Sequence, residues 1–349
     1  MNSSDDLSST PSALLSAYSG TRPERLPVWF MRQAGRSLPE YWKVREGTEM
    51  LESCLRPELS AEITCQPVRR HGVDAAIFFS DIVIPLRLAG VDVDIVRGVG
   101  PVIGSPVRTA ADVDRLTALP GGDMTAIREG VGLAVRELNG RSEPVPLIGF
   151  GGAPFTLAAY LVEGRPSRDH LAARAMMHAD PAAWARLMTW AADRTAEFLL
   201  AQIDAGARAV QLFDSWAGSL SVTDYSERVA PYSARVLSAV EGLVPRVHFG
   251  TGTSEILTLM RDTGAEVVGV DHRIGLDEAV RRLGPSTVVQ GNIDPALLAA
   301  PWDVLQRHVE DVINRGRSAA AHVLNLGHGV PPETDPGVLT RIVELAHAR

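Results

Sequence analysis

The sequence predicts a (β/α)8 barrel, in which eight parallel strands alternate with eight helices. Three observations lead to this fold class. Short apolar runs recur along the chain, each followed by small or ionisable residues and then by a helical stretch. The runs lack the clean apolar–polar alternation of half-exposed strands, which is typical of strands covered on both faces. The chain has 349 residues, enough for a barrel of roughly 250 residues with insertions.

Eight apolar runs are the candidate strands. In chain order they span Pro27–Met31, Ala75–Phe79, Val145–Phe150, Ala209–Phe213, Val247–Phe249, Glu266–Val270, Thr287–Gln290 and His322–Leu326. Alternating strands and helices favour right-handed crossovers and a parallel sheet, and eight such units favour closure into a barrel. An open, doubly wound sheet is the alternative. No G-x-G-x-x-G motif follows a strand, which weakens a dinucleotide-binding version of that alternative.

The sequence also marks where helices begin and end. Asp180-Pro181 supplies an N-cap and a proline at the first helical position, for a helix that runs to Gly206. The apolar residues of that segment fall broadly on one stripe, as in a helix packed on a core. Four shorter helices are expected further along the chain, at Ser254–Gly264, Leu276–Leu283, Trp302–Asn314 and Pro336–Ala346.

Two segments exceed what a barrel needs. Residues 1–20 begin with a polar, acidic stretch and are expected to form a flexible N-terminal lead. The second segment is 82–144, where Leu86–Leu88 and Val91–Val96 predict the arms of a β-hairpin that turns at Ala89-Gly90. Because no internal repeat or low-complexity linker divides the chain, residues 21–349 are expected to be a single catalytic domain.

Composition and charge disfavour several functional classes. The net charge of −8 argues against broad nucleic-acid binding, which needs a basic face. No window approaches the roughly 18 consecutive apolar residues of a membrane span, and the start of the chain lacks the features of a signal peptide. The two cysteines, Cys54 and Cys65, are too few for a disulfide framework. We therefore expect a cytoplasmic protein with neither nucleic-acid nor membrane partners.

Polar residues collect after the predicted strands, where barrel enzymes build their active sites. The eight segments that follow the strands are Arg32–Arg36, Ser80-Asp81, Gly151–Thr156, Asp214–Gly218, Gly250–Gly252, Asp271–Arg273, Gly291–Asp294 and Gly327–Gly329. Guanidinium groups bind carboxylate or phosphate in a bidentate manner. The segments therefore predict one cleft for an anionic substrate.

A metal centre is not expected in this cleft. Zinc needs Cys or His ligands, and no cysteine lies at a strand end. His328 with Asp271 or Asp294 is a combination that a hard-metal site would use, but no H-x-x-x-H or paired-Glu motif supports it. P-loop and nucleophile-elbow patterns are absent as well. The residues alone favour a metal-free site and leave the reaction open.

Six segments resemble the signatures of the uroporphyrinogen decarboxylase family. The two longest are PVWFMRQAGR at Pro27–Arg36 and IGFGGAPFTL at Ile148–Leu157. The others are Phe79–Ile82, Leu212–Ser215, Gln290–Asn292 and Asn325–Gly329. They occur in order along nearly the whole chain. The family fold is a single (β/α)8 barrel, in agreement with the strand count.

The resemblance implies an activity, a substrate and a site. Enzymes of that family remove CO2 from the four acetate side chains of uroporphyrinogen III, giving coproporphyrinogen III without a metal or organic cofactor, and the resemblance also suggests a homodimer. It implies catalytic roles for Asp81, Arg32, Arg36, Tyr160 and His328. Substrate contacts are implied for Arg32, Gln33, Ala34, Gly35, Arg36, Asp81, Tyr160, Ser215 and His328.

Other interpretations remain open beside this one. Asp81 can be a helix cap after a strand, and Tyr160 can be a core residue with a satisfied hydroxyl. His272 departs from the family pattern, which has tryptophan after Asp271, and the wall formed by that loop is therefore undefined. Two rival functions are a methyltransferase on the same barrel, with zinc held by His and Cys, and a catalytically silent tetrapyrrole carrier. The Arg32/Arg36 pair and the lack of a suitable cysteine favour the decarboxylase.

Overall fold

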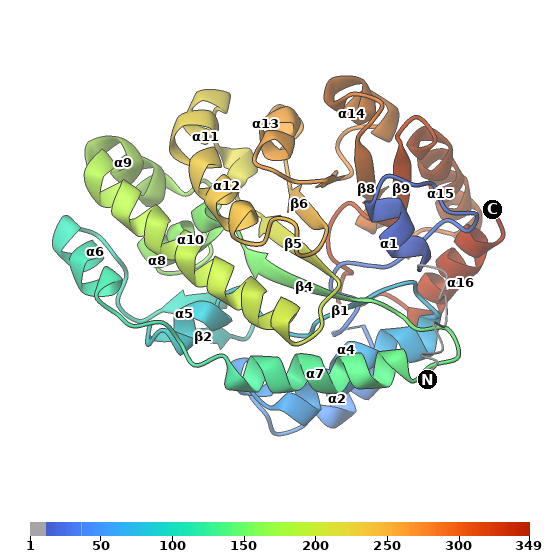
Figure 1. Ribbon diagram of the computed structural model, residues 1–349, viewed down its shortest axis with the longest axis horizontal. Coiled ribbons are helices and arrows are strands. Elements are labelled where there is room, and N and C mark those ends of the chain that lie inside the picture. The colour runs from blue at the N-terminus through green and yellow to red at the C-terminus, as the bar shows by residue number, and fades with distance from the viewer. Residues whose placement is uncertain (1–11, 36) are drawn as a thin grey trace, which may run out of the picture.

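The computed structural model describes residues 12–35 and 37–349. Its centre is a seven-stranded parallel sheet in the order β1-β4-β5-β6-β7-β8-β9, curled on itself with helices around the outside (Figure 1). The strands are β1 Ala76–Ile77, β4 Leu147–Gly152, β5 Ala209–Asp214, β6 Arg246–Gly250, β7 Val267–Gly269, β8 Val288–Ile293 and β9 Ala321–Leu326. The predicted class, a parallel α/β fold of the barrel type, is confirmed.

The segment Pro27–Met31 occupies the eighth place in the barrel without forming a regular strand. All eight predicted runs lie within the described residues, and the other seven form strands. Val28 makes a single parallel bridge to Leu324 of β9. On its other side, the Asp74 backbone N–H, just before β1, donates to the Val28 carbonyl at 2.9 Å. The segment thus joins the first and last strands of the sheet.

Side chains replace the missing ladder partners of this segment. The Asp74 carboxylate accepts a hydrogen bond from the Val28 backbone N–H at 2.8 Å. The Asn325 side-chain oxygen likewise accepts from the Met31 backbone N–H at 3.0 Å. Because these bonds do not use backbone carbonyls, they satisfy the buried N–H groups without extending the β-ladder.

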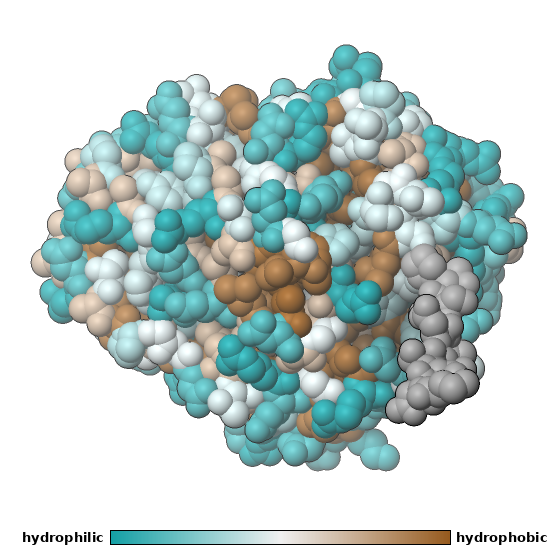
Figure 2. All heavy atoms as spheres, viewed as in Figure 1, coloured by the Kyte–Doolittle hydropathy of each residue, from teal (hydrophilic) through white to brown (hydrophobic). Residues whose placement is uncertain are grey.

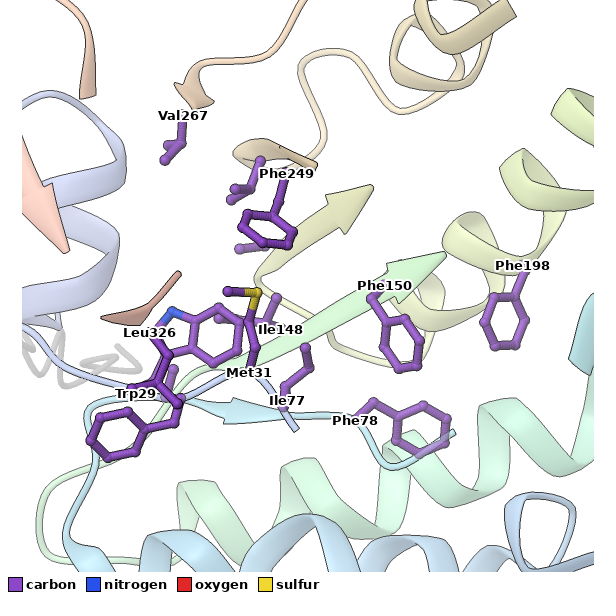
Figure 3. Packing of buried hydrophobic residues seen from close by; sticks show 14 of the residues in the cluster. Trp29, Met31, Ile77, Phe78, Ile148, Phe150, Phe198, Phe249, Val267 and Leu326 are labelled. Atoms are coloured by element: carbon purple, nitrogen blue, oxygen red, sulfur yellow. The ribbon is translucent and has the colours of Figure 1, made fainter. Parts of the chain in front are cut away.

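Side chains from strands on opposite sides of the barrel fill its interior. Figure 3 shows Trp29, Met31 and Ile148 close together there, all of them buried. A hydrogen-bonded chain crosses the same space. The Trp29 indole N–H donates to the Gln290 side-chain oxygen at 3.1 Å, and the Gln290 amide donates to the Gln211 oxygen at 2.8 Å. The interior is therefore a packed core in which the Trp29, Gln290 and Gln211 side chains satisfy one another.

Helices cover the outside of the sheet; in Figure 1, α4 and α7 lie along one side, α10 and α12 along another, and α15 and α16 near the C-terminus. Their bounds are α1 Ala13–Tyr18, α2 Pro39–Val44, α3 Met50–Cys54, α4 Pro57–His71, α5 Ile84–Leu88, α6 Ala110–Thr117, α7 Thr125–Asn139, α8 Pro154–Glu163, α9 Leu171–Ala179, α10 Pro181–Asp204, α11 Val222–Arg228, α12 Ala230–Ala239, α13 Leu257–Asp262, α14 Leu276–Leu283, α15 Trp302–Gly316 and α16 Pro336–His347. Two short 3-10 helices span Ala217–Ser219 and Pro295–Ala299.

The capping signals in the sequence located several helices correctly. The Asp180 side chain accepts from the Ala183 backbone N–H at 2.9 Å and caps α10, as predicted. The predicted helix Leu276–Leu283 is confirmed residue for residue in α14. The helix expected at Ser254–Gly264 is shorter, because residues 254–256 form turns before α13 begins.

The insertion after β1 contains a hairpin, and the predicted arm Val91–Val96 includes one of its strands, but the other predicted arm and the turn were wrong. Leu86–Leu88 belongs to helix α5, and Gly90 follows that helix with φ of +95°. A glycine in the left-handed region is a common helix terminus, so Ala89-Gly90 ends a helix instead of turning a hairpin. The hairpin arms are β2 Val93–Val96 and β3 Gly100–Ile103, paired antiparallel.

The expectation of a flexible lead through Gly20 does not hold for α1. The Ser12 hydroxyl caps this helix by accepting from the Leu15 backbone N–H, and Leu14 and Ala17 are fully buried. The Tyr18 hydroxyl donates to the Gln290 side chain at 2.5 Å. This short segment belongs to the fold because its apolar side chains complete the core; residues 1–11 lie outside the described residues.

The surface drawn in Figure 2 is largely polar, with one apolar area near its middle. Large apolar side chains that are exposed come from separate elements and loops: Trp42, Val96, Val99, Leu171, Val222 and Leu243. Within residues 12–35 and 37–349, no helix has the length and apolar character that a membrane crossing requires.

Candidate active site

A pocket opens beyond the carboxyl ends of β1, β4 and β5. It encloses about 900 Å³, including its open mouth. Its apolar wall consists of Ile77, Phe78, Phe79, Phe150, Phe213 and Val330, and its polar groups include Arg32, Ser80, Asp81 and Ser215. A concave, mainly apolar space with a few charged groups is the usual form of a small-molecule site. The cleft predicted at the strand ends is present on this side of the barrel.

Arg32 lines the pocket from a strained loop. Its φ is +61°, a left-handed conformation that is uncommon outside glycine. Gly329 makes room for the side chain, because a Cβ atom at that position would lie 2.5 Å from Arg32 Cδ. The loops after Met31 and after β9 therefore meet at Arg32. Arg36, predicted to share its role, lies outside the described residues.

Gln33 holds this loop in place instead of facing the pocket. Its side-chain oxygen accepts from the Phe30 backbone N–H at 2.9 Å, and its amide donates to the Ala75 carbonyl at 2.8 Å. Both ends of the amide are thus occupied by backbone. Gln33 was expected to contact substrate; in this geometry it supports Ala34 and Gly35, which do line the pocket.

Asp81 has a structural bond and a place in the pocket. Its Oδ1 accepts from the Val83 backbone N–H at 3.1 Å, which organises the turn leading into α5. The same residue lines the cavity. Its charge also acts on its neighbours, since it raises the pKa of both Tyr160 and Cys54. Asp81 does not cap α5, because the N-cap of that helix is Val83 and has no side-chain cap bond; it holds the turn before the helix and also lines the pocket.

Tyr160 is held beside these two charges on helix α8. Burial is the main cause that raises its pKa to about 12; the negative charge of Asp81 raises it further, while Arg32 and a hydrogen bond from Trp216 oppose the shift. The hydroxyl therefore keeps its proton at neutral pH and can donate it in a hydrogen bond. Arg32, Asp81 and Tyr160 form one electrostatic group, although they are far apart in the sequence.

Ser215 and His328 come to the same region from two further strands. Ser215 follows β5 and lines the pocket, and its carbonyl accepts from the Thr251 hydroxyl at 2.9 Å. His328 follows β9. Loss of solvent around the ring, and next the charge of Arg32, lower the pKa of His328. A neutral imidazole beside Arg32 can donate one hydrogen bond and accept another.

The loop after β7 adds an ion pair and a second imidazole. Asp271, which is buried, pairs with Arg273 at 2.6 Å and accepts from the Gly252 backbone N–H at 2.5 Å. His272 packs against the neighbouring loop, because a Cβ atom at Gly327 would lie 2.3 Å from the His272 backbone nitrogen. Among the residues that the structure describes, no group of three or more His, Cys, Asp or Glu side chains is arranged to hold a metal ion.

Sequence reasoning missed part of the pocket wall. Tyr41 and Met50 line it, and they come from α2 and α3, which follow the first loop and precede the next strand. A search restricted to strand ends has no signal for such residues. Trp216 was included in a strand-end segment but was given no role; its ring lies 5.8 Å from that of Tyr160.

Comparison with known proteins identifies the family. Residues 9–349 match the family model described as uroporphyrinogen decarboxylase (URO-D). The chain is 66% identical to uroporphyrinogen decarboxylase from Arthrobacter sp. (strain FB24), over 97% of each chain. It is 60% identical to uroporphyrinogen decarboxylase from Leifsonia xyli subsp. xyli (strain CTCB07), over 96% of this chain and 94% of that one.

Solved structures with the same fold carry other names. A methyltransferase from Methanosarcina mazei superposes with a TM-score of 0.77 at 19% identity, over 95% of this chain and 96% of that one. A putative vitamin-B12 independent methionine synthase from Listeria monocytogenes superposes with a TM-score of 0.53 at 12% identity, over 93% and 96%. At these identities the likeness shows the fold alone, so the fold does not separate decarboxylases from methyltransferases. The sequence match does separate them: the chain belongs to the uroporphyrinogen decarboxylase family.

Proposed function

We propose that this protein is a uroporphyrinogen decarboxylase, a carboxy-lyase of porphyrin and heme biosynthesis. It removes CO2 from the four acetate side chains of uroporphyrinogen III and releases coproporphyrinogen III. The observation that carries this proposal is that Arg32 and Asp81 line one pocket and that both charges act on the Tyr160 hydroxyl, in a chain of this family.

The pyrrole ring itself supplies the electron sink. Protonation of the ring carbon adjacent to the one that bears the acetate arm makes the ring cationic. The bond between the acetate methylene and its carboxylate then breaks, CO2 leaves, and the electron pair neutralises the ring as an exocyclic methylene. A second proton adds to that methylene to give the methyl group, and the ring carbon loses the first proton. No external oxidant or reductant is needed, which is why we propose that no cofactor takes part.

Asp81 stabilises the cationic ring. Its carboxylate accepts the pyrrole N–H hydrogen bonds while its Oδ1 also holds the Val83 N–H. The apolar wall of the pocket, which includes Phe78 and Phe213, excludes water. A fixed charge has most effect where water is excluded.

The remaining polar residues hold the substrate carboxylates. Arg32 binds them through its planar guanidinium, and the family resemblance gives Arg36 the same role. Tyr160, Ser215 and His328 donate hydrogen bonds to the peripheral carboxylates, and one of these groups delivers a proton. An arginine is a poor general acid because its pKa normally lies above ~12; Tyr160 and His328 are the better candidates.

The decisive experiment is anaerobic turnover of uroporphyrinogen III by purified protein that has been treated with chelator and dialysed. We expect coproporphyrinogen III to form at the same rate before and after treatment. Activity that returns only after addition of zinc, pyridoxal phosphate or another cofactor would exclude the mechanism described above. No turnover of either preparation would exclude the function itself.

We further propose that the protein is a homodimer in the cytoplasm, with the porphyrinogen as its small-molecule partner. The family resemblance supports the dimer. Both cysteines are buried thiols without a disulfide, which supports a reducing compartment. Sedimentation equilibrium should give twice the 37.5 kDa chain mass; a monomer mass across the micromolar range would contradict the dimer.

A further inference from the structure

We propose that Trp216 and the buried His170 are positioning residues that hold the phenol ring of Tyr160 in place. This inference rests on the proposed function, because it concerns the use of Tyr160 in that reaction. The three rings form a chain, His170–Trp216–Tyr160, that runs from the N-cap of α9 to helix α8.

The ring geometry makes this chain continuous. The centroids of His170 and Trp216 are 4.8 Å apart with an angle of 45° between the planes. Those of Trp216 and Tyr160 are 5.8 Å apart at 66°. Edge-to-face and tilted pairs at such distances are favourable arrangements for aromatic rings. A displacement of the His170 ring would therefore shift the Trp216 ring, which packs directly against Tyr160.

The backbone of Trp216 is held from another element. The Thr156 hydroxyl, at the start of α8, accepts from the Trp216 backbone N–H at 3.4 Å and donates to Asp214 Oδ1 at 3.1 Å. Asp214 is fully buried. Thr156 thus holds the main chain of Trp216, and His170 packs against its ring.

The position of Tyr160 gives this restraint a purpose. Its phenol group can both donate and accept a hydrogen bond, and the charges of Asp81 and Arg32, which line the pocket, act on it. Because Trp216 packs against the Tyr160 ring, it limits the directions in which the phenol oxygen can point.

His170 is unusual for a buried residue in its unpaired ring nitrogens and in its backbone conformation. It is 2% exposed, and neither ring nitrogen has a hydrogen-bond partner among the described residues. Its φ of +50° is left-handed, where histidine is enriched relative to most other non-glycine residues. A backbone outlier with unpaired buried nitrogens costs free energy and is a reason to look for a function. Histidine here combines an aromatic ring with tolerance of the left-handed backbone.

Two substitutions at His170 separate ring positioning from fold stability. His170→Asn keeps a residue that tolerates the left-handed backbone but removes the ring, so we expect near-normal Tm with kcat lowered several-fold. His170→Phe keeps the ring but places a bulky residue at positive φ, so we expect lower Tm with near-normal kcat at a temperature where it is folded. A purely structural role would make kcat follow Tm in both variants, and that result would overturn the proposal.

A double-mutant cycle tests whether Trp216 acts through Tyr160. Loss of part of the ring contact with Tyr160 predicts that Trp216→Phe lowers kcat by about two- to tenfold while KM changes little. In a Tyr160→Phe background the same change should have no further effect on kcat. Additive losses would show that Trp216 acts independently of Tyr160 and would overturn the proposal. His71→Asn, a change at a buried histidine of α4 outside the site, is the matched control and should leave kcat unchanged.

A spectroscopic measurement keeps this inference separate from the proposed function. The chain has five tyrosines, so NMR of ring-labelled protein, with Tyr160→Phe for assignment, reports on Tyr160 alone. We expect His170→Asn and Trp216→Phe to shift the Tyr160 ring signals, and His71→Asn to leave them in place. Unchanged Tyr160 signals in His170→Asn would overturn the positioning role, even in a protein that turns over uroporphyrinogen. Shifted signals in a protein without turnover would leave positioning intact and refute the function.

Discussion

A single residue of the site can have both a structural and a chemical role. Asp81 organises the turn before α5 through Oδ1 and the Val83 N–H, while its negative charge raises the pKa of Tyr160. The two roles respond differently to substitution. A change that keeps the oxygen but removes the charge can therefore separate them.

Asp81→Asn should reduce kcat by about 10²–10³, the usual worth of an electrostatic stabiliser of the transition state. The asparagine oxygen can still accept from the Val83 N–H, since Asn and Asp cap helices and turns about equally well. We therefore expect the Tm and the affinity for substrate to change little. Steady-state kinetics under anaerobic conditions, with thermal melts of both proteins, is the measurement.

Asp81→Glu is the companion variant, because it keeps the charge and moves the carboxylate. It should be more active than Asp81→Asn. If Asp81 served only to cap the turn, Asn would be the milder change and Glu the more harmful one. A wild-type kcat in the Asn variant would remove Asp81 from the mechanism.

Gln33 shows the limit of motif matching at this scale. Its identity within the PVWFMRQAGR segment is as specific as that of Arg32, and both were expected to contact substrate. A motif gives the identity of a residue but not the direction of its side chain. That direction depends here on Ala75, a distant backbone carbonyl that accepts the Gln33 amide at 2.8 Å.

Secondary-structure elements could be predicted where their signals are local. Helices α10 and α14 have caps and apolar stripes within their own sequence, and they were located correctly. Pro27–Met31 was predicted as a strand because its composition is that of one. Whether it forms a regular ladder depends on Asp74 and Asn325, which take the bonds that backbone carbonyls would otherwise accept, and no local pattern reveals this.

Helix α1 is the element whose contribution to stability can be measured most directly. Leu14 is fully buried against the core, whereas its neighbour Leu15 is only partly covered. Leu14→Ala should lower the free energy of unfolding by about 2–5 kcal/mol, the range for buried leucines, and Leu15→Ala should cost clearly less. Urea unfolding followed by circular dichroism distinguishes them. Equal, small losses for both variants would mean that this segment adds little to the fold.

The whole molecule assembles the site because a barrel brings all strand ends to one edge. Arg32, Asp81, Ser215 and His328 could be grouped from the sequence for that reason, because each follows a predicted strand, whereas Tyr160, within α8, was named through the family resemblance. The pocket also depends on Tyr41 and Met50, which pack over the barrel mouth from outside the repeating strand–helix units. Barrel topology predicts where strands end but not how an added helix covers them.

The fold as a whole should lose stability in mild acid because of two buried histidines. Burial is the main cause that lowers the pKa of His71 and His322 from 6.5 to about 4. In the unfolded chain each regains its ordinary pKa, so the unfolded state binds more protons between pH 6.5 and pH 4, and stability falls as the pH drops through that window. For one such histidine the loss at pH 5 is about 2 kcal/mol relative to neutral pH.

His322→Gln tests this acid sensitivity, because glutamine can still donate to the Gly291 carbonyl that lies 2.6 Å from His322 Nε2, but it does not titrate. The variant will have its own stability at pH 7.5, so the informative quantity is the change between pH 7.5 and pH 5. Urea unfolding at both values should show a smaller loss for the variant than for the wild type, by about 2 kcal/mol. Equal losses in the two proteins would mean that protonation of His322 does not drive acid unfolding, and His71 or the carboxylates at the surface would then have to account for it.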